Sequence, residues 1–179
     1  MTVKEFMILV DVIDNPDEVM GQINKLPKPD RIGKYVVPVS LDDISIGQLI
    51  ELQSIVNIKE LLFVPCRILF KLKDLEILKF PVEQLLGLYM WVMKEVERIN
   101  KLFASTNIPP TTEEIRAGIE KLSFGMFGLI DYYAIRMGIT DHELVMSIPW
   151  TRVYKCMDID AQKTRYERRL REVYQNKNK

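Results

Sequence analysis

Few residues of this 179-residue sequence combine the side-chain type and the spacing that chemistry requires. The only histidine, His142, has no cysteine or carboxylate at the spacing of a metal site, and a single ligand does not hold a metal ion. The two cysteines, Cys66 and Cys156, lie far apart in apolar contexts and outside any Cys-x-x-Cys pair. Isolated thiols of this kind are typical of small buried residues in a reducing compartment. We therefore expect His142 to be an exposed polar residue and both cysteines to be reduced and buried.

The carboxylate pairs and the glycines do not form a catalytic pattern either. Asp42-Asp43 precedes a predicted helix start, where acidic residues favour the helix dipole. Asp158 and Asp160 are two residues apart on a predicted helix, so they lie on different faces and are unsuited to sharing a proton. The segment 125–128 holds two glycines, fewer than a phosphate-binding loop needs, and predicts close packing or a tight turn. With no catalytic motif in view, we predict that the chain is not an enzyme and uses no cofactor or metal.

The composition is that of a globular protein with a packed core. Hydrophobic residues make up 47% and charged residues 28% of the chain, and 25 basic residues are balanced by 25 acidic ones. A neutral chain has no overall attraction to nucleic acid or to an anionic membrane, so any such attraction must be local. The most apolar segment, 61–72, is shorter than the roughly 20 residues that a membrane span needs. With no signal peptide visible, we expect a protein of the cytosol of the cell that makes it, without a membrane partner.

Residues 1–40 are predicted to form a small strand–helix–strand element. The apolar, β-branched run 6–13 favours a short strand, and Asn15 offers the N-cap of a short helix after it. Residues 35–39 predict a second short strand, which Pro38 confines to a sheet edge. This element is a candidate surface for lying against a partner.

Residues 41–107 predict a helical body. A capping box at Ser45 starts one helix, and a second is predicted over 59–72. Pro81 opens a third and longer helix, whose apolar residues recur every three and four positions in a wide stripe. That stripe predicts a helix at the centre of the core.

Residues 108–179 predict a C-terminal helical region that ends in a long basic helix. The double proline of segment 107–110 halts the preceding helix and marks a boundary. Gly138 is predicted to end a buried aromatic helix. Further helix starts lie at the capping boxes Thr111/Glu114 and Thr140/Glu143 and at Pro149. The fold class is therefore mainly α: a helical bundle with a small N-terminal β-containing element.

The predicted C-terminal helix carries the most informative pattern. Its first half has an apolar stripe, and residues 163–179 hold seven basic side chains against two acidic ones. One interpretation is a solvated helix end whose cations complement the helix dipole. The other is a binding surface for an acidic protein, or for nucleic acid through its phosphates. In that interpretation the candidate partner interface comprises Trp150, Tyr154, Lys163, Arg165, Arg168, Arg169 and Arg171.

Several segments within residues 108–174 form a pattern of helix starts and apolar positions. They are Ile108–Gly118, Phe124–Gly128, the start at Thr140-x-x-Glu143, Ile148-Pro-Trp150 and Tyr166–Leu170. This pattern resembles small helical proteins encoded in the tail and virion-structure modules of bacteriophages, and its end is similar to the tail-assembly chaperones of long-tailed phages. The segment Asp43–Leu52 looks like one that recurs in helical proteins of crAss-like phages, which have short tails. The N-terminal element departs from the chaperone pattern and favours the crAss-like resemblance.

The resemblance implies a non-enzymatic virion component near the portal and tail, in a ring or connector, or an internal passenger of the particle. Its location would be the virion, after synthesis in the cytoplasm of the host bacterium. Its partners would be portal, tail or ring proteins and further copies of itself in a symmetric assembly. One alternative is a transient tail-assembly chaperone. A second is a nucleic-acid-binding regulator that uses the basic helix, which the neutral overall charge and the lack of a recognition motif do not favour.

Overall fold

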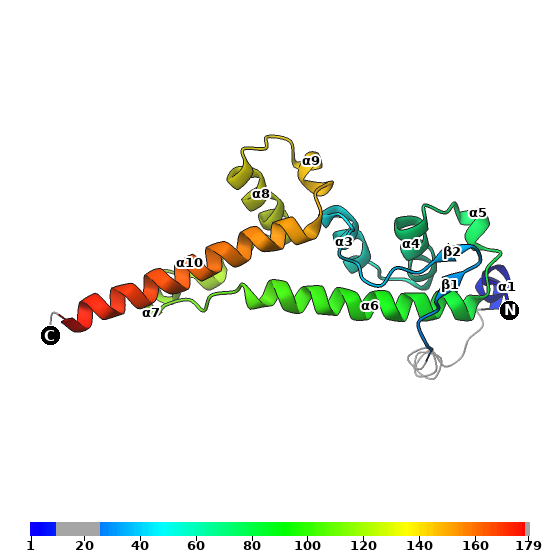
Figure 1. Ribbon diagram of the computed structural model, residues 1–179, viewed down its shortest axis with the longest axis horizontal. Helices are drawn as coiled ribbons and strands as arrows, with labels where there is room; N and C mark the ends of the chain where they lie inside the picture. The colour runs from blue at the N-terminus through cyan, green and yellow to red at the C-terminus, as the bar shows by residue number, and fades with distance from the viewer. Residues whose placement is uncertain (10–25, 178–179) are drawn as a thin grey trace. The chain divides into compact units, whose positions relative to one another are not determined.

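The computed structural model describes residues 1–9 and 26–177 and is mainly helical, with one two-stranded antiparallel sheet in that part of the chain (Figure 1). The predicted fold class, mainly α with a small β element near the N-terminus, is confirmed. In chain order the elements are α1 (Val3–Leu9), β1 (Arg31–Ile32), β2 (Tyr35–Val36), α3 (Ile46–Gln53), α4 (Ile58–Phe70), α5 (Asp74–Ile77), α6 (Val82–Ser105), α7 (Thr112–Arg116), the 3-10 helix η2 (Ile119–Lys121), α8 (Gly125–Met137), α9 (His142–Met146) and α10 (Trp150–Lys177).

The chain divides into two compact units. Unit 1 comprises Met1–Leu41 and Gln48–Arg98, and unit 2 comprises Asp42–Gly47 and Ile99–Lys179. The division falls within the continuous helix α6, whereas the sequence predicted boundaries after residues 40 and 107.

Residues 3–9 of unit 1 form the helix α1, so the strand predicted over 6–13 is wrong for the described residues 6–9. The cause is a capping box. The amide of Thr2 donates to Glu5 Oε2 at 2.7 Å, and the amide of Glu5 donates to Thr2 Oγ1 at 3.3 Å. This reciprocal pair satisfies two amides that a helix start leaves without partners, and it outweighs the modest strand preference of β-branched residues. The helix predicted after Asn15 lies outside the described residues.

The strands β1 and β2 form a short hairpin in which Arg31 pairs with Val36 and Ile32 with Tyr35. Gly33 in its turn has φ +57°, a left-handed conformation that favours glycine, and a Cβ there would lie 2.8 Å from the Phe80 ring. The strand predicted over 35–39 is therefore shorter, and its partner is the adjacent β1. A helix and a hairpin replace the predicted strand–helix–strand element in the described residues.

The helices α4 and α6 contribute much of the core of unit 1. The side chain of Asn57 accepts a hydrogen bond from the Glu60 amide at 2.9 Å and caps α4. Pro65 lies buried inside α4, which begins at Ile58 close to the predicted start. α6 begins next to Pro81 as predicted, and within unit 1 buried residues recur along it at spacings of three and four: Leu85, Leu88, Val92 and Val96. The short helix α5 was not predicted from the sequence.

In unit 2, the segment 42–47 is held against the start of α10 by backbone hydrogen bonds. The Ile46 amide donates to the Ile148 carbonyl at 2.8 Å, and the Trp150 amide donates to the Ile44 carbonyl at 3.2 Å. Gly47 permits this approach, because a Cβ there would lie 2.8 Å from the Met146 carbonyl oxygen. The start predicted for the last helix at Pro149 is confirmed.

The helix starts of unit 2 agree with the sequence in part. The Thr111–Glu114 capping box is confirmed, with the Thr111 amide donating to Glu114 Oε2 at 2.6 Å. α8 ends at the left-handed Gly138 as predicted. The predicted Thr140–Glu143 box is wrong: the N-cap of α9 is Asp141, whose side chain accepts from the Glu143 amide at 2.9 Å. A carboxylate one residue nearer the helix has displaced the threonine as the cap.

Candidate interaction surface

The first half of α10 packs inside unit 2. Trp150 is 2% exposed, and Val153 and Ala161 are buried with it. The rings of Trp150 and Tyr154 both lie about 6 Å from that of Phe103 near the end of α6, which places them in one aromatic cluster. Two members of the predicted partner interface, Trp150 and Tyr154, are thus occupied by contacts within their own unit.

Two of the predicted interface arginines bind the connection that follows α6. Arg165 Nη2 donates to the Ser105 carbonyl at 2.6 Å and to the Asn107 carbonyl at 3.3 Å. Ser105 is the last residue of α6, where carbonyl groups lack helical partners and a cation complements the dipole, and Asn107 follows the helix. Arg165 therefore stabilises a chain turn of its own unit.

Arg168 extends this attachment to the start of α7. Its Nη1 donates to the Pro109 carbonyl at 2.6 Å, and its Nη2 lies 3.1 Å from Glu114 Oε2. The pKa of Glu114 is lowered, first by the hydrogen bond from the Thr111 amide and then by the nearby Arg168 charge. The double-proline segment is thus tied to α10 by arginine side chains.

The three remaining members of the predicted interface, Lys163, Arg169 and Arg171, are exposed. They lie in the second half of α10, where residues 171–176 are all exposed. Large apolar side chains are exposed on the same helix: Ile159, Tyr166, Val173 and Tyr174. Ile159, Tyr166 and Val173 are seven residues apart, and Tyr174 follows Val173. At about 3.6 residues per turn, these positions lie on one face of the helix. We call Ile159, Tyr166, Val173 and Tyr174, together with Lys163, the outer face of α10.

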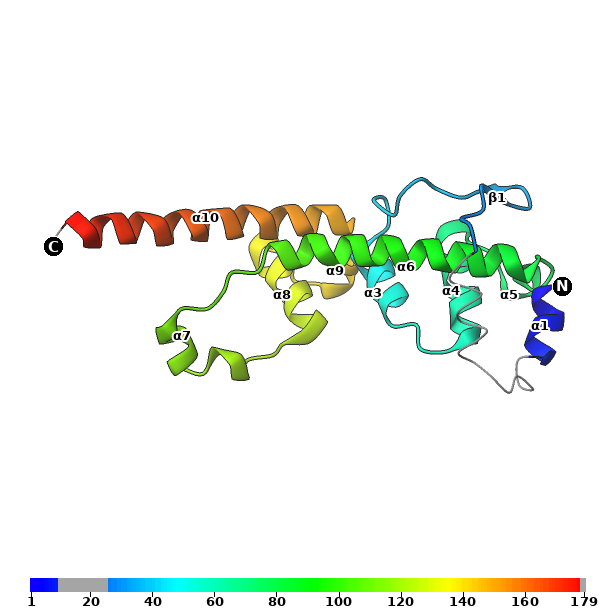
Figure 2. The ribbon, with the colours of Figure 1, turned by 90° about the horizontal axis from the view of Figure 1, so that it is seen from below.

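Residues 112–127, which we call the arm, form a second segment with exposed apolar side chains. The large apolar side chains of the arm are each at least 40% exposed: Ile115, Ile119, Leu122, Phe124, Met126 and Phe127. Figure 2 shows the arm looping away from α10 between the end of α6 and the start of α8. Gly118, with φ +87°, supplies a left-handed turn between α7 and η2, and Gly125, with φ +53°, supplies another at the start of α8. Six large exposed apolar side chains so close in the sequence are typical of an interaction site.

A polar network links α8 to α10. The hydroxyl of Tyr132 donates to Asp160 Oδ2, and the guanidinium of Arg136 binds the same oxygen. Partial burial and the hydrogen bond to Asp160 raise the pKa of Tyr132 to about 12. The hydrogen bonds from Tyr132 and Arg136 lower the pKa of Asp160. Asp158 instead accepts from Gln162 at 2.8 Å, so the two aspartates act separately, as the sequence predicted.

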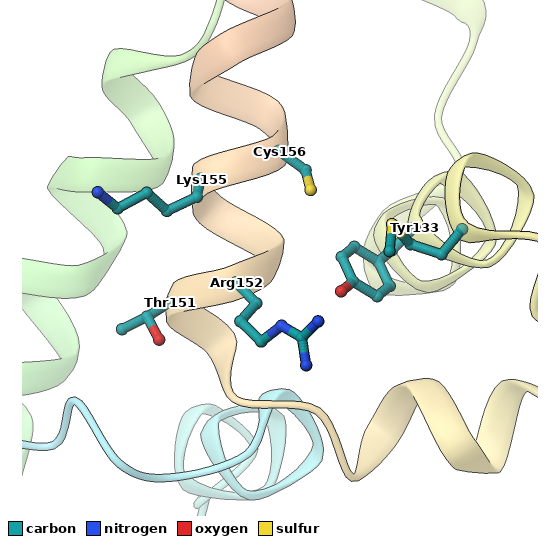
Figure 3. A pocket seen from close by; sticks show the side chains of 6 residues that line it. Tyr133, Thr151, Arg152, Lys155 and Cys156 are labelled. Carbon is teal, nitrogen blue, oxygen red and sulfur yellow. The ribbon is translucent and has the colours of Figure 1, made fainter.

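A pocket of about 370 Å³ lies between α8 and α10. Figure 3 shows Arg152 and Cys156 on the side of α10 that faces Tyr133, whereas Lys155 and Thr151 point away from it. The remaining lining residue is Met137. No carboxylate or histidine is among these six residues, so they offer the Cys156 thiol no general base.

The two thiols and the imidazole differ in their surroundings. Cys66 is buried in α4, and burial raises the pKa of its thiol to about 12. Cys156 is free and half-buried rather than fully buried as predicted. His142 lies in the first turn of α9, with Nε2 3.5 Å from Asp131 Oδ1 and its ring perpendicular to that of Phe127 at a centroid distance of 5.1 Å.

The described residues 1–9 and 26–177 contain no group of three or more Cys, His, Asp and Glu side chains able to hold a metal ion. No helix in the same ranges is long and apolar enough to cross a membrane. No protein-family model, curated protein or solved structure matches this chain.

The sequence did not reveal the arm or the Tyr132–Arg136–Asp160 network. The arm reads as an amphipathic helix, since Ile115, Ile119 and Leu122 have helical spacing, and only Gly118 signals the break. In the network, the spacing of Tyr132 and Arg136 by four residues places them on one helix face, but nothing in the sequence names Asp160 as their partner.

Proposed function

We propose that this chain is a non-enzymatic structural protein of a bacteriophage particle, a ring-like or connector-like component of the portal and tail region or an internal passenger, that acts through protein–protein contacts. The sequence resemblance supplies the phage context. The observation that carries the proposal is the second half of α10, which exposes basic and large apolar side chains together: Lys163, Arg169 and Arg171 with Tyr166, Val173 and Tyr174. Covering the apolar side chains of such a surface with a partner removes them from water and so favours binding.

The partner surface in this proposal is narrower than the seven residues that the sequence suggested. Trp150, Tyr154, Arg165 and Arg168 serve contacts within unit 2. Lys163, Arg169 and Arg171 remain as exposed cations beside Tyr166 and Tyr174. Basic and aromatic residues together are typical of binding hot spots.

A transient assembly chaperone is the alternative that one observation favours. The arm exposes Leu122, Phe124 and Phe127 around glycine turns, and an exposed apolar surface suits the binding of an unfolded or helical segment. A chaperone would be abundant in lysates of infected cells and missing from purified particles, whereas a virion component would be present in both.

The experiment is a charge reversal of the three exposed cations, Lys163→Glu with Arg169→Glu and Arg171→Glu. We expect a folded protein whose incorporation into particles falls at least about tenfold, because reversal opposes the complementarity that guides docking. Incorporation is measured by quantitative mass spectrometry of purified particles, and folding by circular dichroism.

The matched control carries the same change of charge on exposed lysines of unit 1, Lys59→Glu with Lys79→Glu and Lys94→Glu. It should be incorporated like the parent. Equal incorporation of the α10 variant and the parent would show that these cations are a solvated helix end and would overturn the proposal that they contact a partner.

A further inference from the structure

The pocket between α8 and α10 lies within unit 2 and has the size of a small-ligand site. Its volume of about 370 Å³ falls at the lower end of the roughly 300–1,000 Å³ that is usual for such sites. Met137 and the ring of Tyr133 give the pocket apolar walls, and Arg152 and Cys156 supply polar atoms from α10. An apolar cavity with a few polar groups is the common form of a site for a small organic molecule.

The hydroxyl of Tyr133 is the observation that points to a ligand. Tyr133 is 2% exposed, yet no hydrogen bond joins its hydroxyl to another group within the described part of the chain. A buried phenol usually has a hydrogen-bond partner, because a polar group that is removed from water without one costs free energy. Figure 3 shows this hydroxyl pointing toward α10, on the side where Arg152 and Cys156 lie. A ligand atom that accepts a hydrogen bond in the pocket would satisfy it.

Arg152 supplies the charge of the site. Among the described residues its guanidinium has no ion pair or hydrogen bond, and Figure 3 shows it extending toward Tyr133. Of the neighbouring cations, Arg136 is bound to Asp160, and Lys155 points away from Tyr133. A guanidinium binds a carboxylate through two parallel hydrogen bonds. One guanidinium and one hydroxyl therefore favour a ligand with a single carboxylate.

We propose that this pocket binds a small organic carboxylate with an apolar body. The carboxylate accepts hydrogen bonds from the Arg152 guanidinium and the Tyr133 hydroxyl, and the apolar body lies against Met137 and the Tyr133 ring. The bound molecule covers the thiol of Cys156, which lines the same cavity. This binding goes beyond the proposed function, because it uses the first half of α10 and not the exposed cations of the second half.

The probe is hexanoate, with hexanamide as a neutral molecule of the same shape and inorganic phosphate as an anion without an apolar body. Binding to the full chain is measured by isothermal titration calorimetry and by the rate at which iodoacetamide, an uncharged reagent, alkylates Cys156. Peptide mass spectrometry separates Cys156 from Cys66, and a free thiol in the same buffer reports any direct effect on the reagent. We expect saturating hexanoate to slow alkylation of Cys156 at least about fivefold, because it excludes the reagent from the thiol. Hexanamide and phosphate at the same concentration should have little effect.

Three variants test the two polar groups. Arg152→Gln should weaken hexanoate binding by about 10- to 100-fold, because it removes the charged hydrogen-bond donor. Tyr133→Phe should weaken binding by about tenfold. It should also leave the melting temperature of the free protein unchanged or higher, because the hydroxyl that it removes has no partner in the described residues. Lys155→Gln is the matched control, since it removes the same charge from the same helix at a side chain that points away, and it should bind hexanoate like the parent.

A parent protein whose Cys156 hexanoate does not protect would overturn the proposal. Equal protection by hexanamide would show an apolar cavity that does not recognise a carboxylate, and would overturn it as well. Equal weakening by Lys155→Gln and Arg152→Gln would reduce the effect to net charge, with the same consequence. A Tyr133→Phe variant that binds like the parent would contradict the role of the hydroxyl. The charge reversal in the second half of α10 leaves this pocket unchanged, so the two proposals fail separately.

Discussion

The two longest helices use their apolar residues differently. α6, with 24 residues, buries Leu88, Val92 and Ile99 completely, so burial continues along its length. α10, with 28 residues, buries side chains from Trp150 to Ala161, and then exposes its apolar residues. Since the stability of a helix in a protein comes mainly from packing of an apolar face, α6 is explained by the fold alone. The second half of α10 is explained by the contacts we propose it makes.

The largest expected effect is a difference in stability between matched isoleucines of the two helices. Ile99→Ala in α6 removes a fully buried side chain and should lower the free energy of unfolding by about 2–5 kcal/mol. Ile159→Ala in α10, at a position 45% exposed, should cost less than about 1 kcal/mol. Urea denaturation of both variants measures the difference. Equal losses of unfolding free energy in the two variants would mean that Ile159 is packed as deeply as Ile99 and would contradict the difference between the two helices.

A smaller effect is expected from the polar network that fastens α8 to α10. Asp160→Asn weakens its bonds with Tyr132 and Arg136 and should lower stability by about 1 kcal/mol, because charged hydrogen bonds are strong but these groups are partly exposed. The control is the same substitution at a nearby carboxylate, Asp158→Asn. We expect it to lower stability less, because the partner of Asp158 is the neutral Gln162.

The same network gives a dependence of stability on pH. The folded chain holds the Tyr132 proton to about pH 12, while the unfolded chain releases it near 10, so stability falls as pH rises between these values. Tyr132→Phe should make the melting temperature less sensitive to pH in that range. The pKa of Asp160 is lowered, so its stabilising effect is present above the ordinary carboxylate pKa and is lost as pH falls through the folded value. An alkaline profile that Tyr132→Phe leaves unchanged would contradict this assignment.

The smallest effect is a difference in thiol reactivity that leaves stability unchanged. Burial raises the pKa of Cys66 to about 12, so little reactive thiolate forms there, whereas Cys156 lines an open pocket beside α8. We expect alkylation near pH 8 to modify Cys156 more than about 100-fold faster than Cys66. Mass spectrometry of peptides from a timed reaction measures both rates, and comparable rates at the two sites would contradict the burial of Cys66.

Local signals in the sequence predicted much of the fold. The caps and prolines that start α6, α7 and α10 act over a few residues, and the structure has helices where those residues predict them. The strand predicted over 6–13 is wrong for residues 6–9, where the capping box of Thr2 and Glu5 starts a helix. Short apolar runs are ambiguous between strand and helix when periodicity alone is used.

The candidate surface was harder to predict because it depends on contacts distant in the sequence. A row of arginines at 165, 168 and 169 looks uniform, yet Arg165 and Arg168 bind carbonyls about 60 residues earlier, while Arg169 is exposed. Helical spacing also cannot tell whether Ile115 and Ile119 are covered by other parts of the chain. The periodicity of the sequence indicates which face of a helix is apolar. Whether that face is covered by the rest of the chain is seen only in the tertiary structure.

The most direct test of the proposed function is quantitative mass spectrometry of particles purified from a host that produces this protein, with its copies counted against the capsid protein. Our account predicts recovery in a fixed number of copies that matches the symmetry of a portal or tail assembly. Absence from particles while the protein is abundant in the lysate would contradict a virion component and favour the transient chaperone.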